Sequence, residues 1–225
     1  MIDFKQIYAT QADAYAHMVA HEDYEGNLLP ALARVRPFPW QTVVELGAGT
    51  GRLARLLSAQ AQKLVMMDIS THMLARAADN VAQRTAADNR RLPLPDHCAD
   101  VALAGWTLGH LAGWCADWQV EIGLAVAEMM RVLKRGGTAV IIETLGTGRE
   151  TPQPPARHLA AYYHWLEQTH DFQHTWIRTD YRFASAQEAA ASTRFFFGDA
   201  LADHLLAQNQ TILPECTGIW WKTID

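Results

Sequence analysis

The sequence predicts an α/β fold around a doubly wound, mostly parallel sheet of seven strands, with an N-terminal helical cap and an antiparallel edge strand. Short apolar or β-branched runs alternate with helical patterns over the first two thirds of the chain, which is how βαβ units appear in a sequence. A chain of 225 residues is long enough for one substantial hydrophobic core and short for two. We therefore expect one domain over residues 1–225: a cap (1–38), a core (39–145) and a C-terminal segment of helices with a closing hairpin (146–225).

The cap is expected to contain two helices within residues 3–35. Tyr8 and Tyr15 are seven residues apart, so they fall on one face of a helix about two turns apart. Together with a second, apolar face, they predict a cap or lid that packs on the rest of the molecule. The apolar face consists of Leu28, Leu29, Leu32 and Val35.

The first two strands of the core are expected at residues 42–46 and 63–67. Asp68 closes the second strand, and Ser70 has the hydroxyl group that suits the N-cap of a following helix. A third strand, short and weak, is expected at about residues 81–87. The apolar face of the helix after Ser70 consists of Met73, Leu74, Ala77, Ala78 and Val81.

The core continues with a fourth strand at residues 100–105, after the turn-rich segment LPLPDHC. A long helix is expected from about residue 117 to residue 134, because apolar residues recur there at helical spacing. We expect Gly136 and Gly137 to end it, since glycine readily takes the left-handed conformation of a helix C-terminus. The fifth strand, residues 138–143, is a nearly continuous apolar run, as in a strand covered on both faces.

The pattern changes after the fifth strand. The segment LGTGRETPQPPARH is rich in glycine, threonine and proline, which predicts a mobile loop. A helix (156–169), a strand (174–183), a helical region (186–208) and a last strand (217–223) are expected to follow. The two strands are expected to close the sheet edge like a hairpin. Most of the many aromatic side chains in this segment should pack in the core.

Bulk composition argues against several classes of protein. The formal net charge is −5 and no cluster of Lys and Arg is longer than Arg90–Arg91, which disfavours binding to nucleic acid. No apolar run approaches the roughly 18 residues that a membrane span needs. The first residues, MIDFKQIYATQADAYAHM, lack the basic and apolar segments of a secretory signal, so we expect a cytoplasmic protein.

The cysteines and histidines have no clear metal-binding pattern. Cys98, Cys115 and Cys216 are scattered and lack CxxC spacing, which argues against a zinc site or a disulfide framework. His17 and His21 have the i, i+4 spacing of a metal pair, but neither HExxH nor a pattern of two histidines and a carboxylate is found. We therefore expect solvated or buried histidines and no bound metal.

The stretch VVELGAGTGRLARLL, residues 43–57, is the candidate ligand loop. A dinucleotide-binding loop, G-x-G-x-x-G, would need glycine where this chain has Arg52, and the Gly-Lys-Ser/Thr ending of a P-loop is absent. Glu45, at the end of the strand, would repel a pyrophosphate and favour a cation. The loop therefore suits a nucleoside without phosphates, such as S-adenosylmethionine. Asp68 is placed to accept ribose hydroxyls, but alone it does not distinguish NAD from S-adenosylmethionine.

The chain carries four motifs in order: E-L-G-A-G-T-G, D-I-S-x-x-M-L, D-N-R-R-L-P-L-P-D-H-C-A-D and R-V-L-K-R-G-G. Together they resemble the class I S-adenosylmethionine-dependent methyltransferases, in the small-molecule branch of the ubiquinone and menaquinone biosynthesis enzymes (methyltransferase type 11). The resemblance covers roughly residues 40–145 and implies a Rossmann-like methyltransferase fold. Two residues depart from the family pattern, Arg135 in place of a proline and Ala99 in place of an aromatic residue, and both are packing positions.

The resemblance also implies which residues hold S-adenosylmethionine, whose product would be S-adenosylhomocysteine. It assigns the methionine end to Glu45, Gly47, Ala48, Gly49 and Gly51, the ribose to Asp68, the adenine to Ile69, Met73, Asp88 and Asn89, and the side facing the substrate to Trp106. Purely structural roles are the alternatives to cofactor binding: a tight turn at the glycines, a solvated loop at Asp88 and a core position for Met73.

Methyl transfer from a sulfonium is an in-line displacement, so the protein mainly positions a nucleophile and excludes water. His110, four residues after Trp106, is the candidate base, because open α/β sheets bind ligands at the carboxyl ends of their strands. A buried histidine bonded to the backbone is the alternative. The cap offers second candidates for the role of base, with surface positions as the alternative: Tyr8, Tyr15, His17, His21 and Glu22. His110, Tyr8 and Tyr15 are also the candidate contacts to the substrate.

The acceptor is expected to be a small molecule. The Asp/Asn-Pro-Pro-aromatic run of methyltransferases acting on DNA amino groups is absent after the fourth strand, and no cysteine follows a proline, as cytosine-ring methylation would need. The alternatives are a protein acceptor, aminopropyl transfer from a decarboxylated cofactor, and a non-catalytic module that binds the cofactor. The sequence leaves open the nucleophile (O, N or C) and the oligomeric state, monomer or homodimer.

Overall fold

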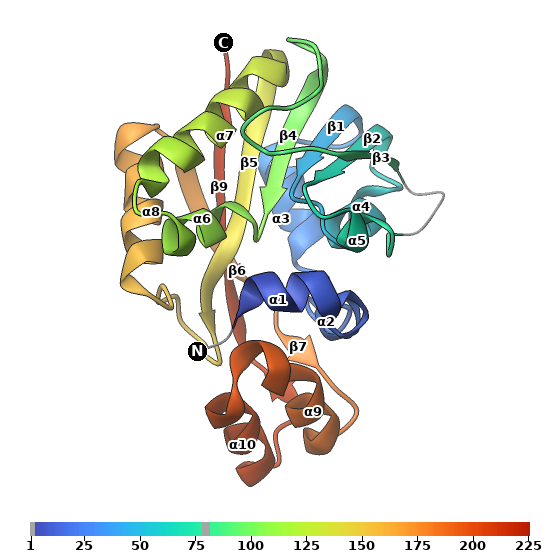
Figure 1. Cartoon of the computed structure of the whole chain (residues 1–225), viewed down its shortest axis with the longest axis vertical. Coiled ribbons are helices and arrows are strands. Elements are labelled where there is room, and N and C mark those ends of the chain that lie inside the picture. The colour runs from blue at the N-terminus through green and yellow to red at the C-terminus, as the bar shows by residue number, and fades with distance from the viewer. Residues whose placement is uncertain (1–2, 78–81) are drawn as a thin grey trace.

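The computed structural model describes residues 3–77 and 82–225, and its centre is a seven-stranded sheet (Figure 1). The strand order is β3-β2-β1-β4-β5-β9-β6; β1 to β5 are parallel, and β9 runs antiparallel to β5 and β6. This topology confirms the predicted fold class, including an antiparallel strand pair at the sheet edge. The strands are β1 (Trp40–Leu46), β2 (Ala61–Asp68), β3 (Gln83–Ala86), β4 (Ala99–Gly105), β5 (Leu133–Thr147), β6 (Gln173–Arg178) and β9 (Glu215–Thr223).

Helices cover both faces of the sheet, with α7 and α8 on one face and α3 and α4 on the other (Figure 1). The helices are α1 (Phe4–Thr10), α2 (Ala12–Val19), α3 (Leu28–Val35), α4 (Arg52–Leu57), α5 (Thr71–Leu74), α6 (Leu108–Trp114), α7 (Trp118–Val132), α8 (Arg157–Thr169), α9 (Ala186–Phe197) and α10 (Asp199–Ala207). Within the ranges that the structure describes, no helix has both the length and the apolar character needed to cross a bilayer.

The alternation of side chains along each strand divides the core between the two faces. In β1, Val43 packs in one cluster with Leu32 of α3, whereas Val44 packs in the other cluster with Ile122 of α7. Full burial of such a side chain contributes about 1.5–3 kcal/mol. The period-two pattern of the strands is therefore what fixes both helical layers against the sheet.

The cap contains three helices where the sequence predicted two. The predicted helix through Tyr8 and Tyr15 is broken at Gln11, which follows α1 and precedes α2. Across this break, the two tyrosine rings meet edge to face, with their centroids 5.4 Å apart. The helix predicted through Leu28 is confirmed as α3.

β5 begins earlier and ends later than predicted. α7 ends at Val132, and the chain passes directly into β5, so Gly136 does not cap the helix. The φ angle of Gly136 is +71°, and it lies where the register between β4 and β5 shifts. At the other end, β5 continues to Thr147 because β9 pairs with it beyond Glu143. The predicted loop is therefore shortened to residues 148–156.

The segment after β2 agrees with the prediction over the part that is described. The Ser70 hydroxyl accepts a hydrogen bond from the backbone N–H of Met73 at 3.2 Å, which confirms the predicted N-cap. The helix assigned there, α5, is short, and two residues of its predicted apolar face, Ala78 and Val81, lie outside the described residues.

The C-terminal segment contains more, shorter strands and helices than predicted. The predicted strand 174–183 ends as β6 at Arg178, and Tyr181–Arg182 form β7, which pairs with β8 (Ile212–Leu213) in a separate small sheet. Gly198, whose φ angle is +91°, separates α9 from α10 within the predicted helical region. β6 and β9 are antiparallel neighbours, but the residues between them include two helices, so the pair is not a hairpin.

A third hydrophobic cluster joins the cap to this C-terminal segment. It packs α2 against β7, β8 and the helices α9 and α10, away from the two cores of the main sheet. Its buried members are Met18, Val19, Tyr181, Phe183, Ala189, Leu205 and Leu213. Chain segments from both ends of the sequence therefore meet on the same side of the sheet.

Candidate active site

Two adjoining cavities, of about 550 and 440 Å³, lie where β1, β2, β4 and β5 end at their carboxyl ends. The cap helices α1 and α2 cross this edge of the sheet (Figure 1). The first cavity is bordered by Glu45 and Asp68, and the second by Glu143 and Glu215. Six side chains line both cavities: Tyr8, Tyr15, Arg52, Trp106, His110 and Trp114.

A tight turn after β1 forms one wall of the first cavity. Gly47 has a φ angle of +62°, and a Cβ atom at this position would lie 2.1 Å from Oγ1 of Thr107. Gly49 has a φ angle of +54°, and its N–H donates to Oδ2 of Asp68 at 2.8 Å. Because glycine allows this conformation and this close approach, backbone atoms rather than side chains border the cavity here.

The Glu45 carboxyl group is buried beside that turn, with the residue 3% exposed. Its Oε2 atom makes no hydrogen bond to any described residue. Burial, together with the nearby Asp68 carboxylate, raises the pKa of Glu45 to about 8. A cationic ligand in the first cavity would supply the partner that Oε2 lacks and would lower this pKa.

Asp68 connects the glycine turn with the start of α5. Its two oxygens accept hydrogen bonds from the N–H groups of Gly49, at 2.8 Å, and Ser70, at 2.7 Å. Burial raises the pKa of Asp68, and these N–H groups oppose the shift. Each carboxylate oxygen has capacity for a further bond, so Asp68 can accept hydroxyl groups from a ligand in the cavity.

Asp88 and Asn89, the predicted adenine contacts, both line the first cavity but differ in their partners. The Arg90 guanidinium binds the Asp88 carboxylate, and this bond lowers the pKa of Asp88. The Oδ1 atom of Asn89 is buried without a hydrogen-bond partner among the described residues. Asn89 is therefore better placed than Asp88 to accept a hydrogen bond from an amino group.

Arg52 lies at the boundary between the two cavities. Its guanidinium is 3.7 Å from the centroid of the Trp106 ring and forms a 2.7 Å ion pair with the buried carboxylate of Glu22. Trp106 has a φ angle of +49°, a conformation that costs a non-glycine residue about 1–3 kcal/mol. The packing of these two side chains fixes the wall between the cavities.

Tyr8 and His110 bring the cap and α6 together over the cavities. A 2.8 Å hydrogen bond joins the Tyr8 hydroxyl to Nε2 of His110, and Trp114 stacks on the imidazole at 4.8 Å. Burial lowers the pKa of His110 to about 4 and raises the pKa of Tyr8 well above its usual value. At neutral pH the imidazole is uncharged and the phenol protonated, so the pair offers hydrogen bonds rather than charge.

Three buried acids line the second cavity: Glu22, which pairs with Arg52, Glu143 and Glu215. Oε1 of Glu143 accepts a hydrogen bond from the N–H of Gly109, at the start of α6, and burial raises the pKa of Glu143 to about 8. Glu215 accepts a hydrogen bond from the Thr144 hydroxyl at 2.6 Å, and burial beside Glu22 raises its pKa. Aromatic and aliphatic side chains form most of the remaining wall.

The structure gathers most of the residues predicted from the sequence. Gly51 packs instead against the core, where a Cβ atom would lie 3.0 Å from Cε of Met66, and His17 and His21 lie outside both cavities. Glu22 lines the second cavity. The predicted residues that line the first cavity are Tyr8, Tyr15, Glu45, Gly47, Ala48, Gly49, Asp68, Ile69, Met73, Asp88, Asn89, Trp106 and His110.

Four residues that line the cavities are not among those predicted from the sequence: Arg52, Trp114, Glu143 and Glu215. Arg52 was identified only as the residue that breaks a dinucleotide motif. A charged residue at the carboxyl end of an apolar strand is the pattern that identified Glu45, and Glu143 shows the same pattern. Glu215 has no comparable signal, because its position depends on the pairing of β9 with β5.

Residues 44–141 match a family model described as a methyltransferase domain. The chain is 27% identical to the ubiquinone/menaquinone biosynthesis C-methyltransferase of Caulobacter vibrioides, over 58% of this chain and 53% of that protein. It is 32% identical to the malonyl-[acyl-carrier protein] O-methyltransferase of Pseudescherichia vulneris, over 54% of this chain and 44% of that protein. The chain therefore spans about half the length of these curated relatives. The matches confirm the family resemblance that the four motifs indicate.

The fold is also similar to that of a solved protein. The crystal structure of a SAM-dependent methyltransferase from Aquifex aeolicus aligns with a TM-score of 0.56, over 92% of each chain. The two sequences are 15% identical over this alignment, so the similarity concerns the fold alone.

The substitution Gly47→Ala is expected to destabilise the protein more than Gly136→Ala. Both glycines have a positive φ angle, but a Cβ at Gly136 meets nothing within 4 Å, whereas one at Gly47 clashes with Thr107. Backbone strain should cost each variant about 1–2 kcal/mol, and the clash should add about 1–3 kcal/mol at Gly47. Urea unfolding measures both; equal destabilisation would contradict the proposed contact.

The free energy of unfolding is expected to decrease as pH rises from about 5 to about 8. In this range the unfolded chain releases the protons of Glu45 and Glu143, whereas the folded chain retains them because burial raises each pKa to about 8. Each group adds a slope of up to about 1.4 kcal/mol per pH unit. Urea unfolding at several pH values should show this slope, and Glu45→Gln and Glu143→Gln should each reduce it. The exposed Glu150→Gln is the control; an equal slope in all variants would contradict the assignment.

Proposed function

Residues 44–141 match the family model of a methyltransferase domain, and from this premise we propose that the whole chain is an S-adenosylmethionine-dependent methyltransferase that acts on a small molecule. The observation that carries the proposal is the buried carboxyl group of Glu45, which lines the cavity walled by the glycine turn and Asp68 and whose Oε2 has no hydrogen-bond partner among the described residues. An acid in this position favours a cationic nucleoside over a pyrophosphate.

The residues of the first cavity fit S-adenosylmethionine in charge and in hydrogen-bonding capacity. Glu45 would hold the ammonium of the methionine end, Asp68 the ribose hydroxyls and Asn89 the adenine amino group, because each has an acceptor atom with remaining capacity. When bound, S-adenosylmethionine supplies an electrophilic methyl group on a sulfonium. The chain's own contribution is to orient this ligand and exclude water from it.

The second cavity is the proposed acceptor site, because it adjoins the first through Arg52, Trp106 and Tyr8. A space of about 440 Å³ with largely aromatic and aliphatic walls suits a compact, mostly apolar molecule. The carboxyl groups of Glu143 and Glu215, both with raised pKa, suit a hydroxyl or amino group on that molecule. The nucleophile is therefore proposed to be an oxygen or nitrogen atom, with a carbon atom as the alternative.

His110 is proposed to position the acceptor rather than to act as a strong base. With a pKa of about 4, its imidazole has little affinity for the proton of a phenol or an amine. It can still accept or donate one hydrogen bond, and its bond to Tyr8 fixes the tyrosine hydroxyl at the boundary of the two cavities. In this arrangement, Tyr8 and His110 orient the nucleophile.

S-Adenosylmethionine is expected to bind with micromolar affinity, and Glu45→Gln and Asp68→Ala should each weaken binding about 10-fold or more, as expected for lost hydrogen bonds to charged groups. Isothermal titration measures this, with NADH as the competing ligand and Asp203→Ala, on the exposed surface of α10, as the control variant. Binding of NADH alone would contradict the proposal. Cofactor binding without turnover of any phenolic, carboxylic or amine acceptor would favour the non-catalytic module.

Tyr8→Phe is expected to lower kcat/KM for the acceptor about 10-fold, because one hydrogen bond at the boundary of the cavities is lost. The affinity for S-adenosylmethionine should not change. The assay is formation of S-adenosylhomocysteine with an acceptor found by screening, and Tyr24→Phe, whose hydroxyl bonds the exposed Glu25, is the control. An unchanged kcat/KM in Tyr8→Phe would remove Tyr8 from the acceptor site.

A further inference from the structure

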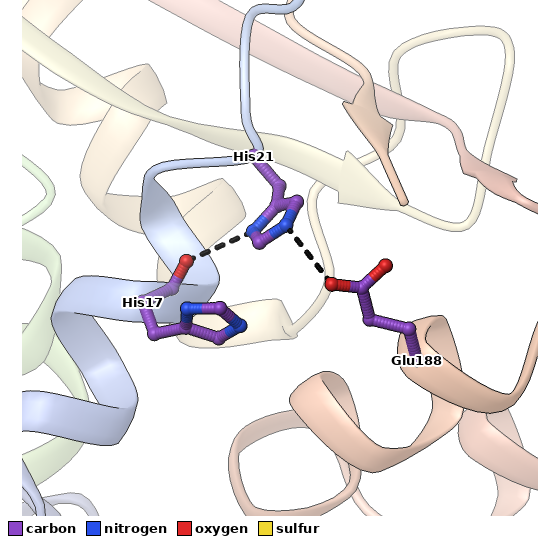
Figure 2. A group of neighbouring side chains, drawn as sticks. All are labelled: His17, His21 and Glu188. Atoms are coloured by element: carbon purple, nitrogen blue, oxygen red, sulfur yellow. Dashed lines mark hydrogen bonds and ion pairs between the residues drawn. The ribbon is translucent and has the colours of Figure 1, made fainter. Parts of the chain in front are cut away.

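Three potential metal ligands from the two ends of the chain meet outside both cavities. His17 lies in the last turn of α2, His21 follows that helix, and Glu188 lies in the first turn of α9. One ligand atom from each residue lies within 4.8 Å of the other two. Figure 2 shows the three side chains grouped where the cap meets the C-terminal helices.

The orientation of His21 directs its Nε2 atom toward the Glu188 carboxylate. Nδ1 of His21 donates to the backbone carbonyl of His17 at 2.9 Å, so Nε2 carries the lone pair of the neutral ring. Nε2 lies 3.5 Å from Oε1 of Glu188 (Figure 2). Two acceptor atoms that face each other in this way require a cation between them, which is either a proton on the imidazole or a metal ion.

The distance between these two atoms suits a metal ion. A charge-assisted hydrogen bond would bring nitrogen and oxygen to about 2.7–2.9 Å, shorter than the 3.5 Å found here. Zn²⁺ binds histidine nitrogen and carboxylate oxygen at about 2.0–2.2 Å, which places two ligands of a tetrahedron about 3.4 Å apart. His17 is exposed, so its ring can rotate to become the third ligand.

Neighbouring groups already hold two of the ligands in place. The His21 ring stacks on Phe183, with centroids 4.7 Å apart. Oε2 of Glu188 accepts a hydrogen bond from the N–H of Ala184 at 2.6 Å, which leaves Oε1 directed toward His21. The alternative role of Glu188 is purely structural, in the cap of α9. The Ser185 hydroxyl accepts a hydrogen bond from the N–H of Glu188, and the Glu188 carboxylate accepts one from the N–H of Ala184. That role uses Oε2 and does not account for the orientation of His21.

We propose that His17, His21 and Glu188 bind a divalent transition-metal ion of the Zn²⁺ type, with a fourth position open to water. Two imidazoles and one carboxylate are a ligand set that such ions favour. The ion would connect α2, which carries Tyr15 of the proposed active site, to α9, and would hold the cap on the C-terminal segment. None of its ligands lines either cavity, so this proposal does not rest on the proposed methyl transfer.

The test is calorimetric titration of the full-length, tag-free, chelator-treated protein with Zn²⁺. One ion per chain is expected, and Zn²⁺ should raise the melting temperature. Glu188→Gln and His17→Ala should each lower the affinity for Zn²⁺ by at least about 10-fold. Loss of a group that only hydrogen-bonds to a metal ligand already costs about 10-fold, and these residues are proposed to be ligands themselves. Both variants should fold, because glutamine also serves in the helix cap and His17 is exposed.

A matched control comes from a second pair of histidine and glutamate in the chain. Nδ1 of His174 lies 3.8 Å from Oε1 of Glu167. Among the described residues, no third histidine, cysteine, aspartate or glutamate places a ligand atom within 4.8 Å of both. Glu167→Gln should therefore leave Zn²⁺ affinity unchanged. The proposal is overturned if the wild-type protein does not bind Zn²⁺ stoichiometrically, or if Glu188→Gln and His17→Ala bind it as tightly as the wild type.

Discussion

The turn after β1 leaves no room for a side chain at Gly47, and the arrangement of the site depends on this steric constraint. With only hydrogen at that position, the turn can pack directly on Thr107, so that the ends of β1 and β4 lie together. The same turn directs the N–H of Gly49 to Asp68, at the end of β2. Three strand ends thus converge on one cavity bordered by backbone atoms, which allows a ligand to approach the chain closely.

The site places acidic groups within mostly apolar surroundings. Glu45 and Glu143 are held there with raised pKa, whereas Arg52 is compensated by Glu22 and by the face of Trp106. A buried carboxyl group without a partner is costly when ionised, so it favours either a proton or a cationic ligand. The electrostatic character of the two cavities therefore follows from burial, and binding of a cationic ligand beside Glu45 would favour release of its proton.

The two cavities share residues of the cap and of α6 and differ in their remaining walls. The first adds the ends of β1, β2 and β4, whereas the second adds the end of β5, the start of α8 and the segment that leads into β9. Phe196 of α9 packs against Phe4, Tyr8 and Tyr15 of the cap. The cap thus touches both the site and the C-terminal helices, and any contact that holds α2 on α9 also supports the wall of the site.

The sequence by itself determined the parallel sheet, the alternation of strands and helices in its core, and the acids at the ends of the first two strands, because these follow from local periodicity and from glycine spacing. It did not determine where α7 ends, how far β5 extends or the break at Gln11. Leu133, directly after α7, pairs with β4, and the far end of β5 pairs with β9, so these boundaries depend on strands distant in sequence. Only the tertiary structure brought Glu143 and Glu215 into one cavity, paired Tyr8 with His110, and placed Glu188 beside His21. These contacts join residues far apart in sequence, and no local pattern specifies such pairs.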